Sequence, residues 1–383
     1  MAACVDVVMS VYNGAKTIES AVASIQAQTV RDIRIIVVND GSTDGTRPII
    51  ECLAAADPRI LLLNRENSGI VDAANAGLAF CTSDIVARLD ADDIALPDRF
   101  EKQLRYLEEH PDCVAVSGAI RHMDEAGTVF GPVLHFRSAD LADPTWYPQR
   151  EPYLAHPFVM MRREAVETVG RYRHVIYAED VDLYWRLQEV GRLSSMPDLL
   201  GYYRMHSESV SSTSVRNGRV AAVNSQRSGL SAMRRRANRP DLAFPTTAQR
   251  DYEQARSLEN MVALGSRDLE ANEAERLAAS ASAKLLELTS YRPYELEFED
   301  CAFVRDSIMR ALPRMTEENR KYSIRMLSGA AARLAARGKL RASQRLAPVH
   351  LYPGVALRLA VRIAGRPIQR TARRLAGRPD FAK

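Results

Sequence analysis

The sequence IRIIVVNDGSTDG at residues 33–45 sets the architecture predicted for this chain. It opens with the mostly apolar, β-branched run Ile33–Val38, which predicts a buried strand. It then becomes polar and glycine-rich at Asn39–Gly45, which predicts a tight loop. The next residues, Thr46–Ala55, carry apolar side chains at helical spacing. A strand, a polar loop and a helix in this order form the repeating unit of an α/β sheet.

The same unit recurs from the N-terminus to about residue 110. Its strand and helix pairs are Val5–Met9 with Lys16–Gln28, Ile33–Val38 with Thr46–Ala55, Ile60–Leu63 with Ile70–Phe80, and Ile85–Leu89 with Pro97–His110. Continuously apolar strands that alternate with helices are typical of a parallel sheet buried on both faces, with right-handed crossovers. The predicted fold class is therefore α/β, with a doubly wound, mostly parallel sheet.

The pattern changes along the rest of the chain. Less regular strands are predicted at Val114–Gly118, Phe158–Arg162 and Leu199–Arg204, and helices at Arg163–Val169 and Asp180–Val190. Beyond residue 213 strand signals nearly vanish, and helical periodicity marks Gln249–Leu264, Leu269–Leu288 and Glu318–Ala336. The sequence therefore predicts a domain at 1–212 and a helical C-terminal region at 213–383.

The composition is that of a packed globular protein, with 46% hydrophobic and 26% charged residues among 383. A net charge of +4 is too small to indicate nucleic-acid binding. The five cysteines are scattered, which argues against a disulfide framework or a zinc site. The N-terminus lacks the pattern of a secretory signal, and no apolar run reaches the ~18 residues that span a bilayer. We therefore expect a cytoplasmic protein with no nucleic-acid partner.

Three carboxylates follow the fourth apolar run, in Asp90-Ala91-Asp92-Asp93. In a sheet of this kind, ligands bind beyond the carboxyl ends of the strands. Neighbouring carboxylates repel each other unless a cation lies between them. Mg²⁺ and Mn²⁺ prefer one or two carboxylates together with phosphate oxygens, which suits a diphosphate substrate. The alternative is a solvated acidic turn that caps the helix starting near Pro97.

Two further residues after strands are candidates for binding a nucleotide. Tyr12 follows the first strand, and its ring offers a face on which a base can stack. Asp40 lies in the loop after the second strand, where it can accept hydrogen bonds from a base or a ribose. The alternatives are a surface tyrosine and a tight turn that caps the next helix.

Four residues of the second half of this domain are candidates for chemistry. Glu179 and Asp180 open a predicted helix, where carboxylates commonly act as caps but also suit a general base that takes a proton from an attacking hydroxyl. Arg204 and His206 end the last predicted strand. Arg204 could meet a departing diphosphate, and His206 could bind the cation beside it. The alternative for this second pair is a structural or solvated role.

These motifs together resemble a known family. In order along the chain come SVYNG (10–14), VVNDGSTDGT (37–46), NRENSGI (64–70), AANAGL (73–78), RLDADDIALPDRFEKQ (88–103), HPFVMMRR (156–163), YAEDVDLYWRL (177–187) and YYRMH (202–206). Their order and spacing resemble the family-two glycosyltransferases of the GT-A fold, of bacterial polysaccharide and cell-envelope type. The resemblance covers about residues 4–212.

The resemblance implies a binding site for a nucleotide-diphosphate sugar donor. Tyr12 and Asp40 would hold the base and the ribose, with Arg65 as a neighbour. Arg204 would also contact the donor. Asp90 would face the ribose or the water shell of the metal. Asp92 would bind the Mn²⁺ or Mg²⁺ ion that bridges the two phosphates, with His206 as the other metal-binding residue and Asp93 as a supporting partner.

The resemblance also implies an inverting single displacement. Asp180 would be the catalytic base, and Glu179 would orient that base or the acceptor. Ser10 stands where a proline is more frequent, and Asn39 where an aspartate is frequent. The second departure leaves the base of the donor open among UDP, GDP and dTDP, of which we expect UDP. The acceptor would be a hydroxyl of a growing polysaccharide or glycolipid.

Other functions share part of this pattern. A sugar nucleotidyltransferase would carry a glycine-rich, basic loop after its first strand, where this chain has SVYNGAK at 10–16. A phosphatase with an aspartyl nucleophile would carry Thr or Val soon after its acidic pair, where this chain has Ile94-Ala95-Leu96. A catalytically inactive scaffold that binds nucleotide sugars also remains open.

The C-terminal tail is strongly basic. No acidic residue lies from Arg341 to Arg378, and the arginines there are Arg341, Arg345, Arg358, Arg362, Arg366, Arg370, Arg373, Arg374 and Arg378. Apolar residues are interleaved at near-helical spacing: Leu351, Val355, Leu359, Ile363 and Ile368. This pattern is typical of an amphipathic helix on an anionic membrane surface, at the inner face of the cell membrane, near a glycan or lipid-linked acceptor. A solvated helix face and an oligomer contact are the alternatives.

Overall fold

The computed structural model describes residues 4–206 and 214–360, which form two compact units. The sheet unit comprises Met1–Pro144, Arg150–Ser209 and Ser231–Thr246, and the helical unit comprises Thr145–Gln149, Val210–Leu230 and Thr247–Lys383. The division predicted after residue 212 stays a prediction. The compact units differ from it in two short segments, because 145–149 pack with the helices and 231–246 pack with the sheet.

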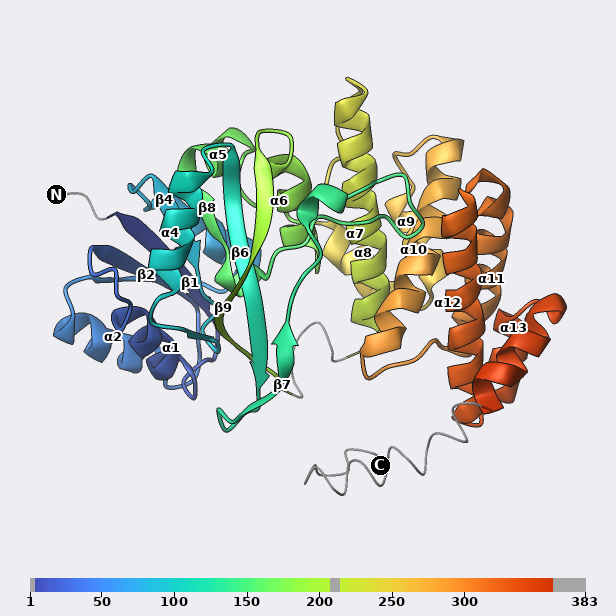
Figure 1. The fold of residues 1–383 in the computed structure, drawn as a ribbon, viewed down its shortest axis with the longest axis horizontal. Coiled ribbons are helices and arrows are strands. Elements are labelled where there is room, and N and C mark those ends of the chain that lie inside the picture. The colour runs from blue at the N-terminus through green and yellow to red at the C-terminus, as the bar shows by residue number, and fades with distance from the viewer. Residues whose placement is uncertain (1–3, 207–213, 361–383) are drawn as a thin grey trace. The chain divides into compact units, whose positions relative to one another are not determined.

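A nine-stranded sheet forms the centre of the sheet unit (Figure 1). Its strands are β1 (Val5–Val11), β2 (Ile33–Asp40), β3 (Ile60–Arg65), β4 (Ile85–Arg88), β5 (Ile94–Ala95), β6 (Cys113–Met123), β7 (Val129–Leu134), β8 (Met160–Arg162) and β9 (Arg192–Arg204). The order is β3-β2-β1-β4-β8-β6-β9-β5, with β7 paired to β6. Strands β1 to β4 are parallel, as are β6 and β9, while β8, β5 and β7 pair antiparallel. The prediction of a mostly parallel α/β fold is confirmed.

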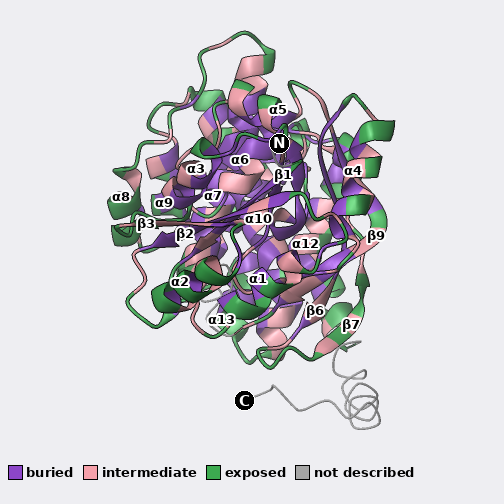
Figure 2. Cartoon of the chain, turned by 90° about the vertical axis from the view of Figure 1, so that its left-hand side faces the viewer, coloured by how far each residue is buried: buried purple, intermediate pink, exposed green. Residues whose placement is uncertain are grey.

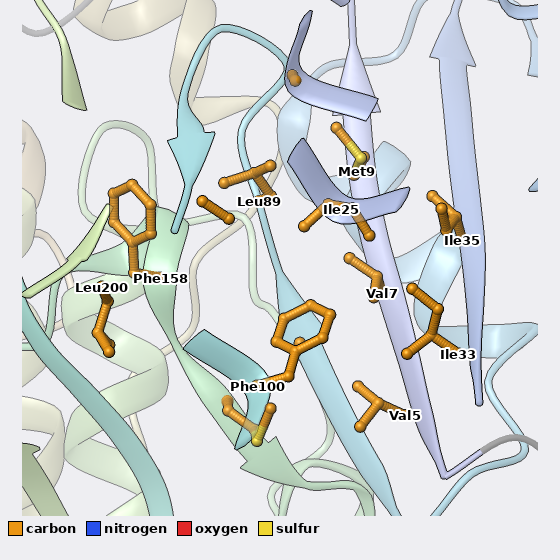
Figure 3. Close-up of a cluster of buried hydrophobic side chains, with 14 of the residues drawn as sticks. Val5, Val7, Met9, Ile25, Ile33, Ile35, Leu89, Phe100, Phe158 and Leu200 are labelled. Carbon is orange, nitrogen blue, oxygen red and sulfur yellow. The ribbon is translucent and has the colours of Figure 1, made fainter. Parts of the chain in front are cut away.

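Helices cover both faces of this sheet. They are α1 (Ile18–Gln26), α2 (Thr46–Ala56), α3 (Ile70–Ala79), α4 (Arg99–Glu109), α5 (Arg163–Thr168) and α6 (Glu179–Leu187). Because successive side chains of a strand point to opposite faces, β1 contributes to two cores. Val7 and Met9 pack with Ile25 of α1 and Phe100 of α4, as Figure 3 shows, whereas Val8 packs on the other face with α3. Figure 2 shows the strands mostly in the colour of buried residues.

The helical unit contains most of α7 (Val215–Arg236) and then α8 (Ala248–Gln254), α9 (Leu258–Gly265), α10 (Ala271–Tyr291), α11 (Phe298–Ala311), α12 (Glu317–Ala336) and α13 (Leu340–Leu346). Residues 352–360 are also helical. Helix α10 packs against α11 and α12, and α13 packs against the same two helices. The expected helical C-terminal region is confirmed within the part of the chain that the structure describes. Across these residues, no helix combines the length and the apolarity that crossing a bilayer requires.

One predicted helix was wrong in detail. The stretch Gln249–Leu264 forms two helices, α8 and α9, that are separated at residues 255–257. The side chain of Ser257 accepts a hydrogen bond from the backbone N–H of Asn260 and thereby caps the start of α9. A capping residue inside an otherwise helical pattern therefore ends one helix and begins another.

Candidate active site

The loops after β1 and β2 lie side by side at one edge of the sheet. Val11 at the end of β1 pairs with Asn39 near the end of β2. Asn13 fixes the two loops together, since its N–H donates to Ser42 Oγ at 3.0 Å and its Oδ1 accepts from the N–H of Thr43 at 2.8 Å. Tyr12 stands beside these bonds with 53% of its surface exposed. Its ring is therefore accessible at the carboxyl ends of the strands, where stacking on a base was predicted.

Asp40 ends β2 and lies next to Arg65, which ends β3. The Asp40 carboxylate is buried and accepts hydrogen bonds from the N–H groups of Ser68 at 3.2 Å and Gly69 at 2.9 Å. The guanidinium of Arg65 is 3.3 Å from the same carboxylate. The structure thus brings the two predicted nucleotide residues together. Both Asp40 oxygens accept hydrogen bonds from the residues that precede α3. A nucleotide base that binds Asp40 would therefore have to share or replace these hydrogen bonds.

The loop after β4 gathers Asp90, Asp92 and Asp93, whose carboxylate oxygens lie within 4.8 Å of one another. Asp93 is only 1% exposed. Its Oδ1 accepts a hydrogen bond from the backbone N–H of Arg204 at 2.7 Å, while its Oδ2 is buried without a hydrogen-bond partner among the described residues. Burial and the charges of Asp92 and Asp90 raise the pKa of Asp93 well above its usual range. Burial and the neighbouring carboxylates therefore disfavour the charged form of Asp93, and a cation bound in the loop would oppose that effect.

His206 reaches this acidic loop from the residues after β9. Its Nε2 is 2.6 Å from Asp92 Oδ2, although the two residues are 114 positions apart in the sequence. Burial and the charge of Asp90 raise the pKa of Asp92, while His206 opposes that rise. The two residues predicted to bind a metal are thus adjacent. Their nitrogen and oxygen atoms are of the kinds that divalent transition metals bind.

Arg204 was expected to contact the diphosphate, but its guanidinium is bound to the protein itself. It is 7% exposed, and its guanidinium donates to main-chain carbonyl oxygens. Nε donates to the carbonyl of Asp92 at 2.7 Å, and Nη1 donates to the carbonyls of Asp124 and Glu125 at 3.1 Å each. In this structure Arg204 braces the acidic loop against the turn after β6. Its predicted contact with the donor stays a prediction.

Glu179 and Asp180 begin α6, where the N-terminal end of the helix favours negative charge. Asp180 Oδ1 accepts a hydrogen bond from the N–H of Val181 at 2.8 Å. Burial and the charge of Asp180 raise the pKa of Glu179 to about 7, and burial raises the pKa of Asp180. Just before the helix, Tyr177 has a φ of 60°, an uncommon conformation for a bulky residue. Raised carboxylate pKa values are typical of a general acid or base.

Arg88 is the residue that sequence reasoning missed. It ends β4, is 5% exposed, and donates from Nη2 to Asp90 Oδ1 at 2.7 Å. Its positive charge also lowers the pKa of Glu179 and Asp180 against the effect of burial. Arg88 thus couples the acidic loop to the carboxylates of α6. The available signal was a charged residue inside the apolar run Ile85–Leu89.

A buried histidine and tyrosine lie near this arginine. His156 Nε2 is 2.8 Å from the hydroxyl of Tyr172. Burial and the charge of Arg88 lower the pKa of His156 well below its usual range, so its imidazole is neutral near pH 7. Burial raises the pKa of Tyr172 to about 12. This neutral pair therefore adds no charge to the site.

The chain resembles solved structures at low sequence identity. One is the mannosyltransferase PcManGT from Pyrobaculum calidifontis in complex with GDP-Man and Mn²⁺, at 20% identity and a TM-score of 0.48, covering 84% of each chain. Another is S. aureus TarS 1–349 in complex with UDP-GlcNAc, at 16% identity and a TM-score of 0.45, covering 93% of this chain and 87% of that one.

Curated proteins match at higher identity. The amylovoran biosynthesis glycosyltransferase AmsE of Erwinia amylovora is 33% identical over 208 residues, which cover 53% of this chain and 77% of that protein. The putative glycosyltransferase EpsE of Bacillus subtilis (strain 168) is also 33% identical, over 49% of this chain and 67% of its own length. The sequence profile described as glycosyl transferase family 2 matches residues 6–170. The chain therefore belongs to glycosyl transferase family 2 and is a glycosyltransferase.

Proposed function

We propose that this enzyme is a metal-dependent, inverting glycosyltransferase that moves a sugar from a nucleotide diphosphate, with UDP as the expected nucleotide, to an acceptor hydroxyl. One observation carries the proposal. Arg88 interacts with both acidic parts of the site. It donates a hydrogen bond to Asp90 in the loop of Asp90, Asp92 and Asp93, and its charge acts on the carboxylates that begin α6. The sugar donor and the catalytic base that activates the acceptor hydroxyl can therefore lie at the same edge of the sheet.

The residues present fit a divalent cation. Asp93 Oδ2 is a buried carboxylate oxygen without a hydrogen-bond partner in the described residues, and three carboxylates crowd within 4.8 Å. Asp92 and His206 would hold the ion, and Asp93 would support them. Oxygen ligands and one imidazole nitrogen suit Mn²⁺, and Mg²⁺ would use the oxygens alone. When bound, the ion supplies positive charge that offsets the charge developing on the departing diphosphate.

The residues at the first three strand ends would bind the donor. Tyr12 would stack on the base, and Asp40 with Arg65 would hold the base and ribose. Asp90 would face the ribose or the water shell of the metal. Stacking and hydrogen bonds that fix the nucleotide also fix the sugar carbon against the acceptor, and such orientation lowers the barrier of a two-substrate reaction.

Asp180 would take the proton from the acceptor hydroxyl as that oxygen attacks the sugar carbon, and Glu179 would orient that base or the acceptor. A single displacement inverts the configuration at that carbon. The raised pKa of both carboxylates supports this role, because a base titrating closer to neutral pH is a stronger proton acceptor.

The names of two relatives support the product class that we propose. AmsE is named for the biosynthesis of amylovoran, and a protein of Pasteurella multocida that is 28% identical over 56% of this chain is a chondroitin synthase. That match covers only 21% of the synthase. We propose that this enzyme likewise extends a polysaccharide or a glycolipid.

An anionic membrane surface is the partner we propose for the C-terminal end. Among the described residues beyond α13, Val349 and Leu357 expose 75% and 67% of their surface, whereas Val355 of the predicted apolar stripe is buried. Arg358 is exposed in the same part of the chain. Exposed apolar side chains next to arginines suit lipid headgroups of negative charge. The other arginines from residue 361 onward lie outside the described residues.

The test combines full-length protein, Mn²⁺ and a panel of UDP-, GDP- and dTDP-linked sugars. We expect one donor to raise the unfolding temperature only when Mn²⁺ is present, because a ligand that binds only the folded state stabilises it. Slow hydrolysis of that donor should stop when EDTA is added. Asp92→Ala should lose both responses while its circular dichroism stays unchanged.

Three outcomes would overturn parts of the proposal. Transfer that continues in EDTA would remove the metal dependence. A product that retains the configuration of the donor sugar, measured by NMR at the anomeric carbon, would remove the single displacement. Pyrophosphate release from a nucleoside triphosphate and a sugar 1-phosphate would favour the nucleotidyltransferase instead.

A further inference from the structure

Helix α6, which carries Glu179 and Asp180, contains a fully buried aspartate. Asp182 has no exposed surface, and its carboxylate accepts hydrogen bonds from two arginines. Arg173 Nε and Arg186 Nε each donate to it at 2.9 Å. A charge without solvent is costly unless its neighbours neutralise it and satisfy its hydrogen bonds. Asp182 is therefore a fixed anchor in the first turn of α6.

This anchor is the start of a longer series of ion pairs. Arg173 Nη1 donates to Asp241 Oδ2 at 2.8 Å. Arg235 Nη1 donates to the same oxygen at 2.9 Å, and Arg235 Nε donates to Glu189 Oε2 at 2.9 Å. The series runs Arg186, Asp182, Arg173, Asp241, Arg235, Glu189. Positive and negative charges alternate along the series and cancel in sum. The series begins at Arg186 in α6 and ends at Glu189, just after α6.

The segment that completes this series lies far outside the residues matched to the family, which end at residue 170. Helix α7 ends where Asn238 takes a φ of 53°, and the N–H of Arg239 donates to the carbonyl of Arg234 at 2.9 Å. A left-handed residue followed by Pro240 is a typical helix stop. The chain then turns back, and Asp241 reaches Arg173.

Further contacts join the same segment to α6 and to the loop before it. The guanidinium of Arg236 lies 5.4 Å from the ring centre of Trp185, which is buried in the middle of α6. Ser231 is also buried, and its hydroxyl donates to Asp241 and accepts from Arg235 Nη1 at 2.7 Å. Ion pairs, a hydroxyl and a cation–π contact thus hold α6 along its length.

We propose that residues 231–246, named here the α6 clamp, position the carboxylates at the start of α6 for catalysis, with Asp241 and Arg235 as positioning residues. The inference rests on the proposed function of Asp180. Asp182 is two residues from Asp180 on a rigid helix, so a shift of the anchor moves the base with it. A displacement of about 1 Å in a reacting group can lower a rate by as much as about a hundredfold.

The central experiment compares Asp241→Asn with a matched control in the full-length protein. Asp57→Asn is that control, since Asp57 also accepts from an arginine, Arg59, at 2.8 Å, but sits between α2 and β3. We expect Asp241→Asn to lower kcat about tenfold to a hundredfold with the donor KM unchanged, because donor contacts stay intact. Asp57→Asn should lower only the unfolding temperature.

A second measurement does not depend on activity. Amide hydrogen exchange over α6 should be faster in Asp241→Asn than in wild type and unchanged in Asp57→Asn. If the wild type shows no transfer but exchange over α6 changes as expected, the proposed function fails, while the restraint of α6 by residues 231–246 stands. Equal exchange over α6 in both variants and wild type would overturn the clamp.

Two milder variants distinguish a loss of positioning from a general loss of folding. Ser231→Ala removes one hydroxyl partner of Asp241 and should reduce kcat in the same direction but less. Asp241→Glu keeps the charge and should recover part of the rate. A kcat loss in Asp241→Asn that merely equals the loss in Asp57→Asn, or full activity in Asp241→Asn, would reject the positioning role.

Discussion

A buried guanidinium couples the two acidic parts of the site at the scale of single residues. Arg88 is 5% exposed, binds Asp90 directly, and acts through its charge on Glu179 and Asp180. Burial alone would protonate carboxylates that a base mechanism needs in the charged form. The positive charge of Arg88 therefore opposes the rise that burial gives to the pKa of both carboxyl groups.

Arg88→Met should move the acidic limb of the kcat profile to higher pH. The base must be unprotonated, and loss of a positive charge raises the pKa of Glu179 and Asp180, so activity is lost at a higher pH as the solution is acidified. The measurement is the rate of transfer between pH 5 and pH 9. Arg88→Lys keeps the charge and should leave the limb closer to that of the wild type. An unmoved limb in Arg88→Met would contradict the electrostatic coupling.

Asp180→Asn should lower transfer by about 10²–10⁴-fold, the usual contribution of a general base, while donor binding and thermal unfolding stay near those of the wild type. Glu179→Gln should lower transfer less, because the proposed role of Glu179 is to orient the base or the acceptor without taking the proton. Single-turnover transfer with the donor identified in the panel measures both. A fully active Asp180→Asn enzyme would require another base.

At the scale of elements, the close packing of α3 on the sheet depends on a glycine. A Cβ built on Gly77 would lie 2.5 Å from Val8 Cγ1 and 3.2 Å from Val38 Cγ2. These valines belong to β1 and β2, whose carboxyl ends carry Tyr12 and Asp40. The start of α3 also donates to Asp40. Gly77 therefore lets α3 approach the strands that present the predicted nucleotide site.

Gly77→Ala should destabilise the protein by about 1–3 kcal/mol, because overpacking forces the valines or the helix to move. Chemical denaturation followed by circular dichroism measures the change. Gly329→Ala in α12 is the control, since its nearest contact would be 4.0 Å away. There the better helix former should stabilise by up to about 1 kcal/mol. A neutral Gly77→Ala would mean that α3 is less tightly seated than the distances indicate.

At the scale of the whole molecule, the chain carries more than the catalytic fold. The matched family region ends at residue 170, the sheet unit continues beyond it, and the helical unit has its own packed helices. Helix α13 belongs to that packing, because Ala342, Ser343 and Leu346 are buried. The proposed membrane contact therefore begins beyond this helix, and a truncation that tests it has to leave α13 in place.

A chain truncated after Ala360 should bind anionic liposomes less strongly than the full-length protein. The removed tail carries Arg362, Arg366, Arg370, Arg373, Arg374 and Arg378. Each basic side chain near a negative surface contributes about 1 kcal/mol. Co-sedimentation with phosphatidylserine vesicles measures the loss, and neutral vesicles are the control. Equal binding by both proteins would favour a solvated face or an oligomer contact for the tail.

The sequence by itself determined the local elements and the chemistry of the strand ends. Apolar runs with polar loops identified β1 to β4 and the helices between them, because strand and helix periodicities are local. The acidic loop was visible for the same reason. Only the tertiary structure decided that β8 pairs antiparallel between β4 and β6, since strand pairing joins residues far apart in the sequence.

The site also joins residues that are far apart in the sequence, so the sequence alone could not show their contacts. Nothing local to His206 places it 2.6 Å from Asp92, and nothing local to Arg204 directs its guanidinium to main-chain carbonyls. The series of ion pairs through Asp241 likewise depends on the chain turning back after α7. Side-chain type and spacing follow from the sequence, whereas burial, charge neutralisation and contact between distant segments exist only once the chain has folded.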